Sequence, residues 1–257
     1  MNGAFYIGAL GLDAQQRALD VVANNIANIN TTGFKRQTVQ FSNLVAPVRD
    51  GEDFPVAGTD QSASLSGVTV ASTPHVWTQG SLSVTGQPYD LAISGNGFIE
   101  MMGPSGHTLL WRGGTLKIDE EGNLAAADGT LLRANISVPQ GATNLAISAN
   151  GIVTAQIDNT TQVRQIGQIE LAMVKDPDSL TDDGSGYYEA ADESQVTSVR
   201  AGEEGSGTLV QGALEGGNVQ LTNEMVTLML LQRSYAADAQ VVQAGDQLMS
   251  IANDLRR

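Results

Sequence analysis

The segment FYIGALGLDAQQRALDVVANNIANI, residues 5 to 29, decides how the rest of the chain is interpreted. Mostly apolar or small side chains recur along it at steps of three and four residues, at Phe5, Gly8, Leu12, Gln15, Leu19, Val22, Ile26 and Ile29. This heptad spacing predicts an amphipathic helix. We expect the helix to end in NTTG, residues 30 to 33, because turn-forming and β-branched residues disfavour its continuation and glycine accepts positive φ.

The C-terminal part of the chain repeats the pattern. Apolar positions again recur at three- and four-residue steps, at Leu221, Met225, Leu228, Leu231, Tyr235, Ala239, Val242, Met249 and Ala252. The spacing predicts a second long helix. Neither helix has enough neighbouring sequence to fold back on a partner of its own, so we expect the two apolar seams to bury against each other or against another subunit. A simple intramolecular helical hairpin remains an alternative.

Between the two predicted helices the apolar period changes to two. Leu91 and Ile93 alternate with other side chains, as do Leu145 and Ile147, and glycine, asparagine and aspartate punctuate short runs. This pattern predicts an antiparallel β-domain. Residues 47 to 72 are rich in glycine, serine, proline and aspartate with little periodicity, which indicates an extended linker.

Charge and composition exclude several classes of protein. The chain has 28 acidic and 13 basic side chains, a formal net charge of -15, which is the wrong sign for binding nucleic acid. It has no cysteine, so disulfides and thiolate metal sites are excluded. No apolar run approaches the roughly 20 residues that span a bilayer. The N-terminus lacks the features of a signal peptide, so export would need another route.

Titrating side chains do not converge in the sequence as an enzyme would need. The two histidines, His75 and His107, have no recognisable motif partner. The acidic stretch 176 to 183 carries oxygen donors suited to Ca²⁺, but its spacing differs from an EF-hand and favours a turn. We therefore predict no catalytic residue, no metal site and no cofactor. The alternative from another class is a secreted soluble hydrolase or binding module.

Three blocks of sequence resemble the axial proteins of the bacterial flagellum, which are the rod and hook subunits. They are AQQRALDVVANNIANINTTGFKR (14 to 36), QGSLSVTGQPYDLAISGNGFIEM (79 to 101) and QGALEGGNVQLTNEMVTLMLLQRSYAADAQVVQAGDQLM (211 to 249). Long blocks in this order, at both ends of the chain, make the resemblance specific. The middle region is most similar to distal rod subunits, and proximal rod subunits are the alternative.

The resemblance implies an α+β fold in which the terminal helices pair in a coiled-coil-like bundle around which the β-rich antiparallel middle domain is arranged. It divides the chain into an N-terminal helix of the axial core (1–33), a linker (34–78), a β-rich outer domain (79–210) and a C-terminal core helix (211–257). The implied function is a structural subunit of the distal rod, which assembles helically into the drive shaft that transmits torque from motor to hook.

The implied partners are copies of the chain itself, other rod proteins, the hook protein, the P- and L-ring bushing proteins and the flagellar type III export apparatus. The implied location is the periplasm-spanning rod of the basal body, reached without a cleaved signal peptide. This route agrees with the N-terminal sequence described above.

Assembly is expected to depend on the two helices and the turn after the first. Asn24, Asn25, Asn28 and Asn30 could hydrogen-bond across packed helices, and carboxylates near the start of the second helix, Glu215 and Glu224 among them, favour capping. The residues predicted to act in subunit assembly are Leu12, Leu19, Val22, Asn24, Asn25, Ile26, Asn28, Asn30, Gly33, Phe34, Asn218, Met225, Leu228, Gln232, Arg233, Tyr235, Val242 and Met249.

Overall fold

The computed structural model describes residues 2–46, 64–103, 106–157, 163–184, 186–203 and 205–254. The chain folds as two compact units. The helical unit comprises Met1–Ala27, Gln37–Val76 and Gln220–Arg257, and the β unit comprises Asn28–Arg36 and Trp77–Val219. Neither unit is one continuous stretch of sequence. The chain leaves the helical unit after residue 27 and returns to it at residue 37, then leaves it again after residue 76 and returns at residue 220.

The helical unit contains two long helices and a two-stranded sheet. Helix α1 spans Asn2–Ala27 and helix α2 spans Leu221–Asp254. Strands β1 (Gln40–Ala46) and β2 (Ser64–Ser72) pair antiparallel. Within the described residues, no helix has the length and apolarity that crossing a bilayer requires.

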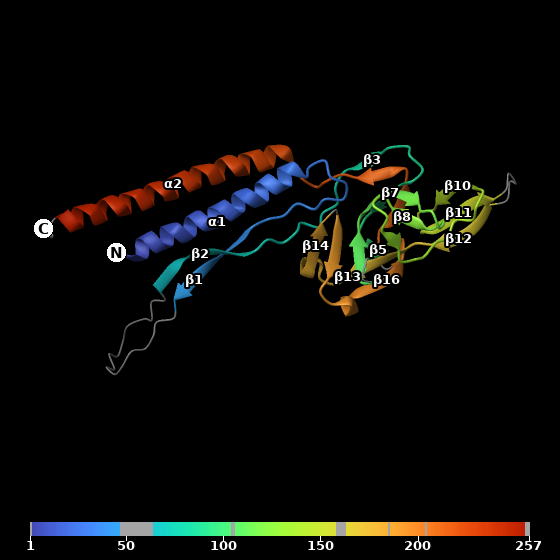
Figure 1. Cartoon of the computed structure of the whole chain (residues 1–257), viewed down its shortest axis with the longest axis horizontal. Coiled ribbons are helices and arrows are strands. Elements are labelled where there is room, and N and C mark those ends of the chain that lie inside the picture. The colour runs from blue at the N-terminus through green and yellow to red at the C-terminus, as the bar shows by residue number, and fades with distance from the viewer. Residues whose placement is uncertain are drawn as a thin grey trace, which may run out of the picture. The chain divides into compact units, whose positions relative to one another are not determined.

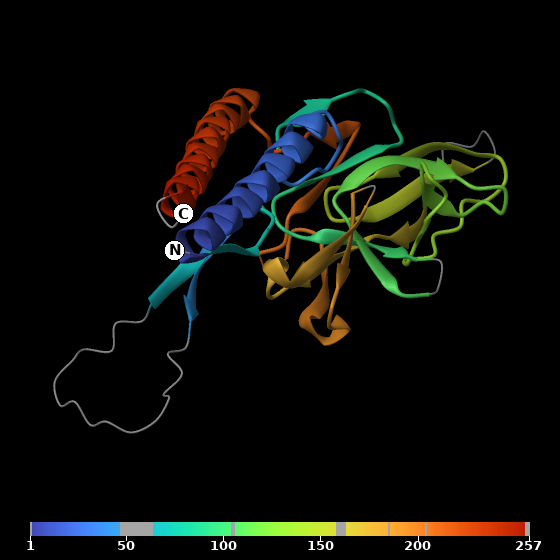
Figure 2. The ribbon, with the colours of Figure 1, turned by 60° about the vertical axis from the view of Figure 1, so that its left-hand side comes forward.

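The two helices lie side by side and run antiparallel (Figures 1 and 2). Val242 of α2 lies opposite Gly8 of α1, and Asp238 lies opposite Gly11. Near the other end of the pair, Asn25 contacts Glu224. The start of α1 and the end of α2 are therefore at the same end of the helical unit.

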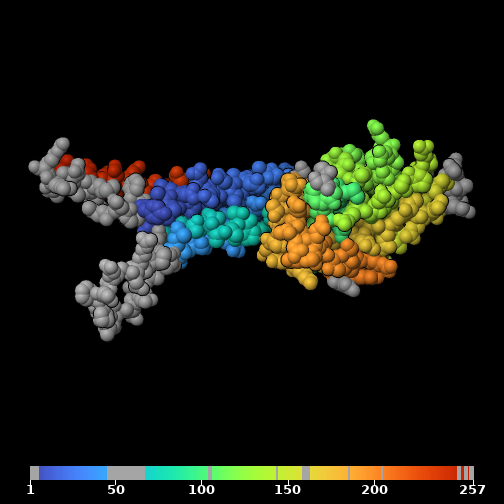
Figure 3. Space-filling view, turned by 60° about the horizontal axis from the view of Figure 1, so that its bottom comes forward, coloured from blue at the N-terminus to red at the C-terminus, as the bar shows by residue number. Residues whose placement is uncertain are grey.

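The prediction of a coiled-coil-like bundle was wrong. The described residues form two α-helices only, and α1 packs against β2 as well as against α2, so that a sheet covers one side of α1 (Figure 3). Coiled coils insert apolar side chains into holes of the facing helix. Here the α1 side of the contact carries Gly8 and Gly11, and the half-buried residues of α2 mix polar with apolar types: Thr227, Leu228, Leu231, Ser234, Asp238, Ala239, Val242 and Gly245.

The reason for this difference is the size of the side chains at the helix contact. A Cβ atom on Gly8 would lie 2.8 Å from Cγ2 of Val242, which is closer than real contacts allow. Gly8 and Val242 are both among the regularly spaced positions of the two helices, but glycine brings the backbones together there without the large apolar side chains that interlock in a coiled coil. The predicted linker, residues 47 to 72, contributes β2 through residues 64–72 to this unit, and residues 47–63 lie outside the described part of the chain.

The β unit consists of short strands joined by tight turns. Its strands are β3 (Leu82–Val84), β4 (Asp90–Ser94), β5 (Phe98–Met102), β6 (Thr108–Trp111), β7 (Gly113–Ile118), β8 (Leu124–Ala126), β9 (Leu131–Leu132), β10 (Ala142–Ile147), β11 (Ile152–Ile157), β12 (Val163–Gln168), β13 (Glu170–Val174), β14 (Leu180–Gly184), β15 (Tyr187–Ala190), β16 (Val196–Arg200), β17 (Thr208–Gln211) and β18 (Ala213–Glu215). Two single-turn 3-10 helices, η1 (Pro177–Ser179) and η2 (Glu193–Gln195), separate the later strands.

The strands of the β unit pair antiparallel in three sheets. The largest has the order β14-β15-β6-β5-β9-β8-β7-β4-β17, with β13 also paired to β5 and β16 to β13. The second has the order β10-β11-β12, and the third pairs β3 with β18. Strand β18 lies six residues before α2 in the sequence, so the third sheet fixes the segment that leads into the C-terminal helix.

The largest sheet buries side chains on both faces. Neighbouring residues in a strand point to opposite faces, and accordingly Ile99 of β5 belongs to the main apolar core while Phe98 belongs to a smaller one. The smaller core also contains Leu110 and Tyr188, and Trp77 packs edge-to-face on Phe98 and Tyr188 at ring-centroid distances of 5.4 and 4.9 Å.

We predict that Gly8→Ala weakens the helical unit. The added methyl group meets Val242 at 2.8 Å, and overpacking of this kind costs about 1 to 3 kcal/mol, partly offset by about 1 kcal/mol of better helix propensity. In a Val242→Ala background the same change should be neutral or stabilising. Urea unfolding followed by far-UV circular dichroism measures both effects.

Gly245→Ala on α2 is the matched control. A Cβ atom there meets no described atom within 4 Å, so this variant should gain about 1 kcal/mol from helix propensity. Equal effects of Gly8→Ala and Gly245→Ala would contradict the close approach of the helices.

We also predict an alkaline loss of stability in the β unit that depends on Tyr188. Burial raises the pKa of the Tyr188 hydroxyl above its ordinary value of 10.0, and the charge of Asp182 acts in the same direction. The unfolded tyrosine ionises near pH 10 while the folded one keeps its proton, so the stabilisation present below pH 10 is lost as the pH rises above it.

Tyr188→Phe should therefore lower the free energy of unfolding at neutral pH, by about 1 to 3 kcal/mol, because it removes the hydrogen bond with the backbone of Lys35. The difference from wild type should narrow near pH 11, because wild type alone loses the tyrosine contribution. Urea unfolding followed by tryptophan fluorescence reports this, since both tryptophans, Trp77 and Trp111, lie in the β unit. A constant difference across this pH range would contradict the prediction.

Candidate assembly surface

Helix α2 exposes a row of large apolar side chains, which we call the α2 stripe. Its members recur with the helical period on one side of the helix, and they are Val226 (52% exposed), Met229 (56%), Leu230 (58%), Val241 (59%) and Ile251 (56%). The side of α2 that faces α1 is a different one, marked by Asp238 and Val242. The stripe is thus not covered by α1.

Helix α1 contributes little apolar surface by comparison. Its buried apolar side chains among the described ones are small or short, Ala14, Ala18 and Val22, and lie at four-residue steps on one side. Tyr6 and Ile7 are exposed near its start. Large exposed apolar side chains gathered on one side of a helix, as on α2, are typical of a protein-protein contact site.

The predicted assembly residues are divided between the two units. In the helical unit, Val22 and Asn25 are buried, Leu12, Leu19, Ile26, Leu228 and Val242 are half-buried, and Asn24, Met225, Gln232, Arg233 and Tyr235 are exposed. The side chain of Met249 lies outside the described ones. In the β unit, Gly33 and Phe34 are buried, Asn28 and Asn218 half-buried, and Asn30 exposed.

Asn25 joins three segments of the helical unit. Its amide nitrogen donates to the backbone oxygen of Gln37 at 2.9 Å and to a carboxylate oxygen of Glu224 at 3.4 Å, and its amide oxygen accepts from the backbone N–H of Gln37 at 2.9 Å. Asn25 and Glu224 are each only 1% exposed. The end of α1, the segment that leads to β1 and the start of α2 are therefore held together by one amide.

The turn after α1 is built around Gly33. Its φ of 71° is in the left-handed region that glycine adopts without strain, and its N–H donates to the backbone oxygen of Glu215 at 2.8 Å. Asn218 fixes the next residues, because its side-chain oxygen accepts from the N–H of Arg36 at 2.6 Å and its amide donates to the backbone oxygen of Thr78 at 3.0 Å. The geometry of this turn therefore depends on glycine at position 33.

A buried ion cluster lies beside this turn, and heptad and turn patterns gave no sign of it. One oxygen of the Glu215 carboxylate accepts from Nζ of Lys35 at 2.7 Å and from the N–H of Gly80 at 2.9 Å. The other accepts from Nε and Nη2 of Arg112 at 3.1 and 2.8 Å. Lys35 also donates to the backbone oxygen of Thr78 at 3.0 Å. Glu215 therefore binds cations of the β unit, where helix capping was the simpler expectation.

Arg112 reaches further into the β unit. Its guanidinium donates to the backbone oxygens of Gly97 at 2.6 Å and Gly95 at 3.1 Å, and it lies over the ring of Phe98 at 5.7 Å. Burial lowers the pKa of the Lys35 ammonium, and the neighbouring charge of Arg112 acts in the same direction, against the attraction of Glu215. The cluster contains two cations and one carboxylate.

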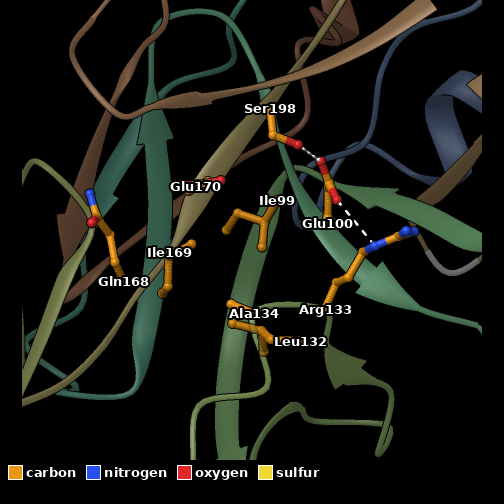
Figure 4. A pocket seen from close by; sticks show the side chains of 9 residues that line it. All are labelled: Ile99, Glu100, Leu132, Arg133, Ala134, Gln168, Ile169, Glu170 and Ser198. Carbon is orange, nitrogen blue, oxygen red and sulfur yellow. Dashed lines mark hydrogen bonds and ion pairs between the residues drawn. The ribbon is translucent and has the colours of Figure 1, made fainter. Parts of the chain in front are cut away.

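The β unit also contains a shallow pocket at the point where β13 and β9 both reach β5 (Figure 4). Its polar side chains include Glu100, which pairs with Arg133 at 3.6 Å and accepts a hydrogen bond from Ser198. Its base is apolar, with Ile99, Leu132 and Ala134 (Figure 4). Among the described residues, no group of three histidines, aspartates or glutamates is placed to hold a metal ion.

Comparison with known protein families matches three parts of the chain. Residues 5–35 match the flagella basal body rod protein family, residues 92–155 the flagellar hook protein FlgE/F/G D1 domain, and residues 210–255 the C-terminal domain of flagellar basal body rod FlgEFG proteins.

Several curated proteins are similar over their full length. The flagellar basal-body rod protein FlgG of Caulobacter vibrioides is 34% identical over 98% of this chain and 99% of its own. FlgG of Borreliella burgdorferi is 33% identical over 100% of both chains. The flagellar basal-body rod protein FlgF of Caulobacter vibrioides is 29% identical over 94% of this chain and 93% of its own.

We predict that Glu215→Gln strongly destabilises the β unit. The change leaves Lys35 and Arg112 buried without a compensating carboxylate, and breaking a buried ion pair in this way costs about 3 to 5 kcal/mol. Urea unfolding followed by tryptophan fluorescence measures the loss. Glu121→Gln, at an exposed turn, should change stability by less than about 0.5 kcal/mol. Equal effects of the two variants would show that the cluster contributes no stability.

Proposed function

This chain belongs to the family of flagellar hook and basal-body rod proteins, and on that premise we propose how it works as a structural subunit of the distal rod. It is a structural protein of the flagellar basal body and not an enzyme, and it assembles with other rod and hook components. Its full-length relatives named FlgG support the distal position within the rod.

The exposed α2 stripe is the observation that carries the mechanism. A helical filament needs heterologous contacts that do not close into a ring. Large apolar side chains that α1 does not cover supply such a contact. Each is a little over half exposed, so burying the rest of it against a neighbouring subunit is worth about 1 to 1.5 kcal/mol. Many repeated contacts of this size add up to a stiff polymer that transmits torque without covalent chemistry.

The predicted assembly residues take two roles in this proposal. The exposed ones, which include Met225, Arg233 and Tyr235, contact neighbouring subunits directly. The buried ones act indirectly, because Val22, Asn25 and Phe34 hold the helices and the turn that present the contact surface. We likewise propose that residues 1–33 and 211–257 form the axial core, residues 34–78 the linker and residues 79–210 the outer domain.

Family membership supports further partners and a location as proposals. The hook protein would follow this subunit along the axis, and the P- and L-ring proteins would surround it as bushings. The flagellar type III apparatus would export it without a cleaved signal peptide, and the assembled rod would cross the periplasm. These assignments rest on the resemblance of the three sequence blocks and on the family to which the chain belongs.

Electron microscopy of basal bodies tests the position in the rod. A strain that lacks this chain should make a short proximal rod with no distal rod and no hook, and plasmid-borne wild type should restore both. Loss of the whole rod, including its proximal part, would instead place the subunit proximally.

We predict that the double variant Met229→Gln, Leu230→Gln abolishes motility while the monomer stays folded. Both side chains are more than half exposed, so glutamine, a good helix former, should leave the helical content unchanged but remove apolar area from the subunit contact. Motility in soft agar and circular dichroism of the purified chain measure the two effects. Gln243→Ala, an exposed polar position of α2, is the control and should stay motile. Normal motility of the double variant would exclude the α2 stripe from assembly.

A further inference from the structure

A second pocket of the β unit lies against the buried ion cluster. It has a volume of about 230 Å³. Lys35 and Arg112 line it, and Lys175 is exposed at its rim. Asn96 and the aromatic rings of Trp77 and Phe98 also line it, and its remaining walls are Gly97 and the apolar side chains of Met173, Val174 and Pro177. None of the described residues that line it is acidic, so its charged groups are all cationic and the rest of its lining is mainly apolar and aromatic.

The single carboxylate of the cluster is already saturated. Both oxygens of Glu215 accept two hydrogen bonds each, from Lys35 and Gly80 on one side and from two nitrogens of Arg112 on the other. A carboxylate has about four acceptor positions, so Glu215 has none left for a further donor. The cluster thus has one negative charge, on Glu215, and two buried positive charges, on Lys35 and Arg112. Lys175 adds a third positive charge at the pocket.

The two buried cations still have donor capacity. An ammonium group has three N–H donors and a guanidinium five. Within the described part of the chain, Lys35 uses two donors, to Glu215 and Thr78, and Arg112 uses four. Lys35 and Arg112 are 1% and 5% exposed and both line the pocket, so their remaining donors are shielded from bulk water.

Two aspartates of the β unit, Asp176 and Asp182, have hydrogen-bond partners outside this pocket. Asp176, next to Lys175 in sequence, accepts from the N–H of Asp178 at 3.2 Å and caps η1. Asp182 accepts from the N–H of Gly184 at 2.8 Å on the exposed strand β14. The pKa of Lys35 is lowered by burial and by Arg112, which agrees with a surplus of positive charge at this site.

We propose that this pocket binds a carboxylate, and that the carboxylate is an Asp or Glu side chain of a second copy of the chain. Charge-assisted hydrogen bonds from Lys35 and Arg112 would hold its oxygens, and Lys175 would pair with it at the rim. About 230 Å³ accommodates the end of one side chain, with the rings of Trp77 and Phe98 against its methylene groups.

A second copy is the occupant that charge and assembly favour. The chain has 28 acidic against 13 basic side chains, so each copy offers many carboxylates and few competing cations. This part of the inference rests on the proposed function, since a rod places copies beside one another at very high local concentration. The contact would set the register between neighbours in a way that the α2 stripe alone, being apolar, does not.

The first experiment uses the unassembled full-length chain and acetate as the probe, with chloride at equal ionic strength as reference. Acetate should raise the midpoint of thermal unfolding in a saturable way, and quench or shift tryptophan fluorescence, because Trp77 lines the pocket. Lys175→Gln should weaken the apparent affinity about threefold to fivefold, as expected for one exposed ion pair. Lys117→Gln, an exposed lysine on β7, should leave it unchanged.

Two outcomes of the first experiment would overturn the proposal. One is the absence of saturable stabilisation by acetate beyond that of chloride. The other is an equal effect of Lys175→Gln and Lys117→Gln, which would show screening of the net charge and not a site. Both measurements use the monomer, so they are independent of whether the chain forms the rod.

The second experiment identifies the source of the carboxylate. In a sedimentation assay of self-association, acetate should compete with assembly of wild type, and Lys175→Gln should assemble at several-fold higher protein concentration than Lys117→Gln. If acetate binds the monomer but neither acetate nor Lys175→Gln affects assembly, the pocket takes a free anion and the second copy is excluded. If wild type itself does not assemble, the proposed function fails while the acetate result stands.

Discussion

The carboxylate of Glu215 is the point at which the β unit joins its most distant segments. It binds Lys35, which follows α1 by a few residues, and Arg112, which lies in the middle of the unit, and Glu215 itself lies shortly before α2. The backbone oxygen of the same residue accepts from Gly33. A single side chain and its peptide group therefore fix the two segments from which both helices depart. Because a half-satisfied buried network destabilises a protein more than an apolar core does, every member of the cluster is needed.

In the helical unit, small residues of α1 allow close packing within the subunit, whereas large apolar residues of α2 stay exposed. Helix α1 carries small residues, Gly8, Gly11, Ala14 and Ala18, where α2 and strand β2 pack closely against it. The large exposed side chains of α2 take no part in this packing. This separates the contacts that fold the subunit from those available to join subunits. A subunit built in this way can be folded alone and still present an adhesive surface, which a fully buried helix pair could not do.

Some of these features could be predicted from the sequence and others could not, and the reasons are physical. Local signals were sufficient for the two helices and for the turn at Gly33, because periodicity and positive φ are properties of neighbouring residues. The contact between Gly8 and Val242 lies on the predicted seams of both helices, but heptad counting also placed Met225 and Tyr235 there, and the structure leaves these two side chains exposed. The ion cluster was missed, because Lys35, Arg112 and Glu215 are separated by 103 and 180 residues from their partners, and no pattern within a window of sequence connects them.

The antiparallel contact between the first and last helices also determines which unit can fold first. Gly8 meets Val242 only when nearly the whole chain has been made, because synthesis begins at the N-terminal end. The β unit, whose hairpins pair near neighbours in sequence such as β7 with β8, can form earlier. Contacts between distant residues carry the larger loop-closure cost and form late. The helical unit is thus completed last, so a chain still in transit keeps its first helix without its partner, and the surface that could join it to other copies does not exist until the chain is whole.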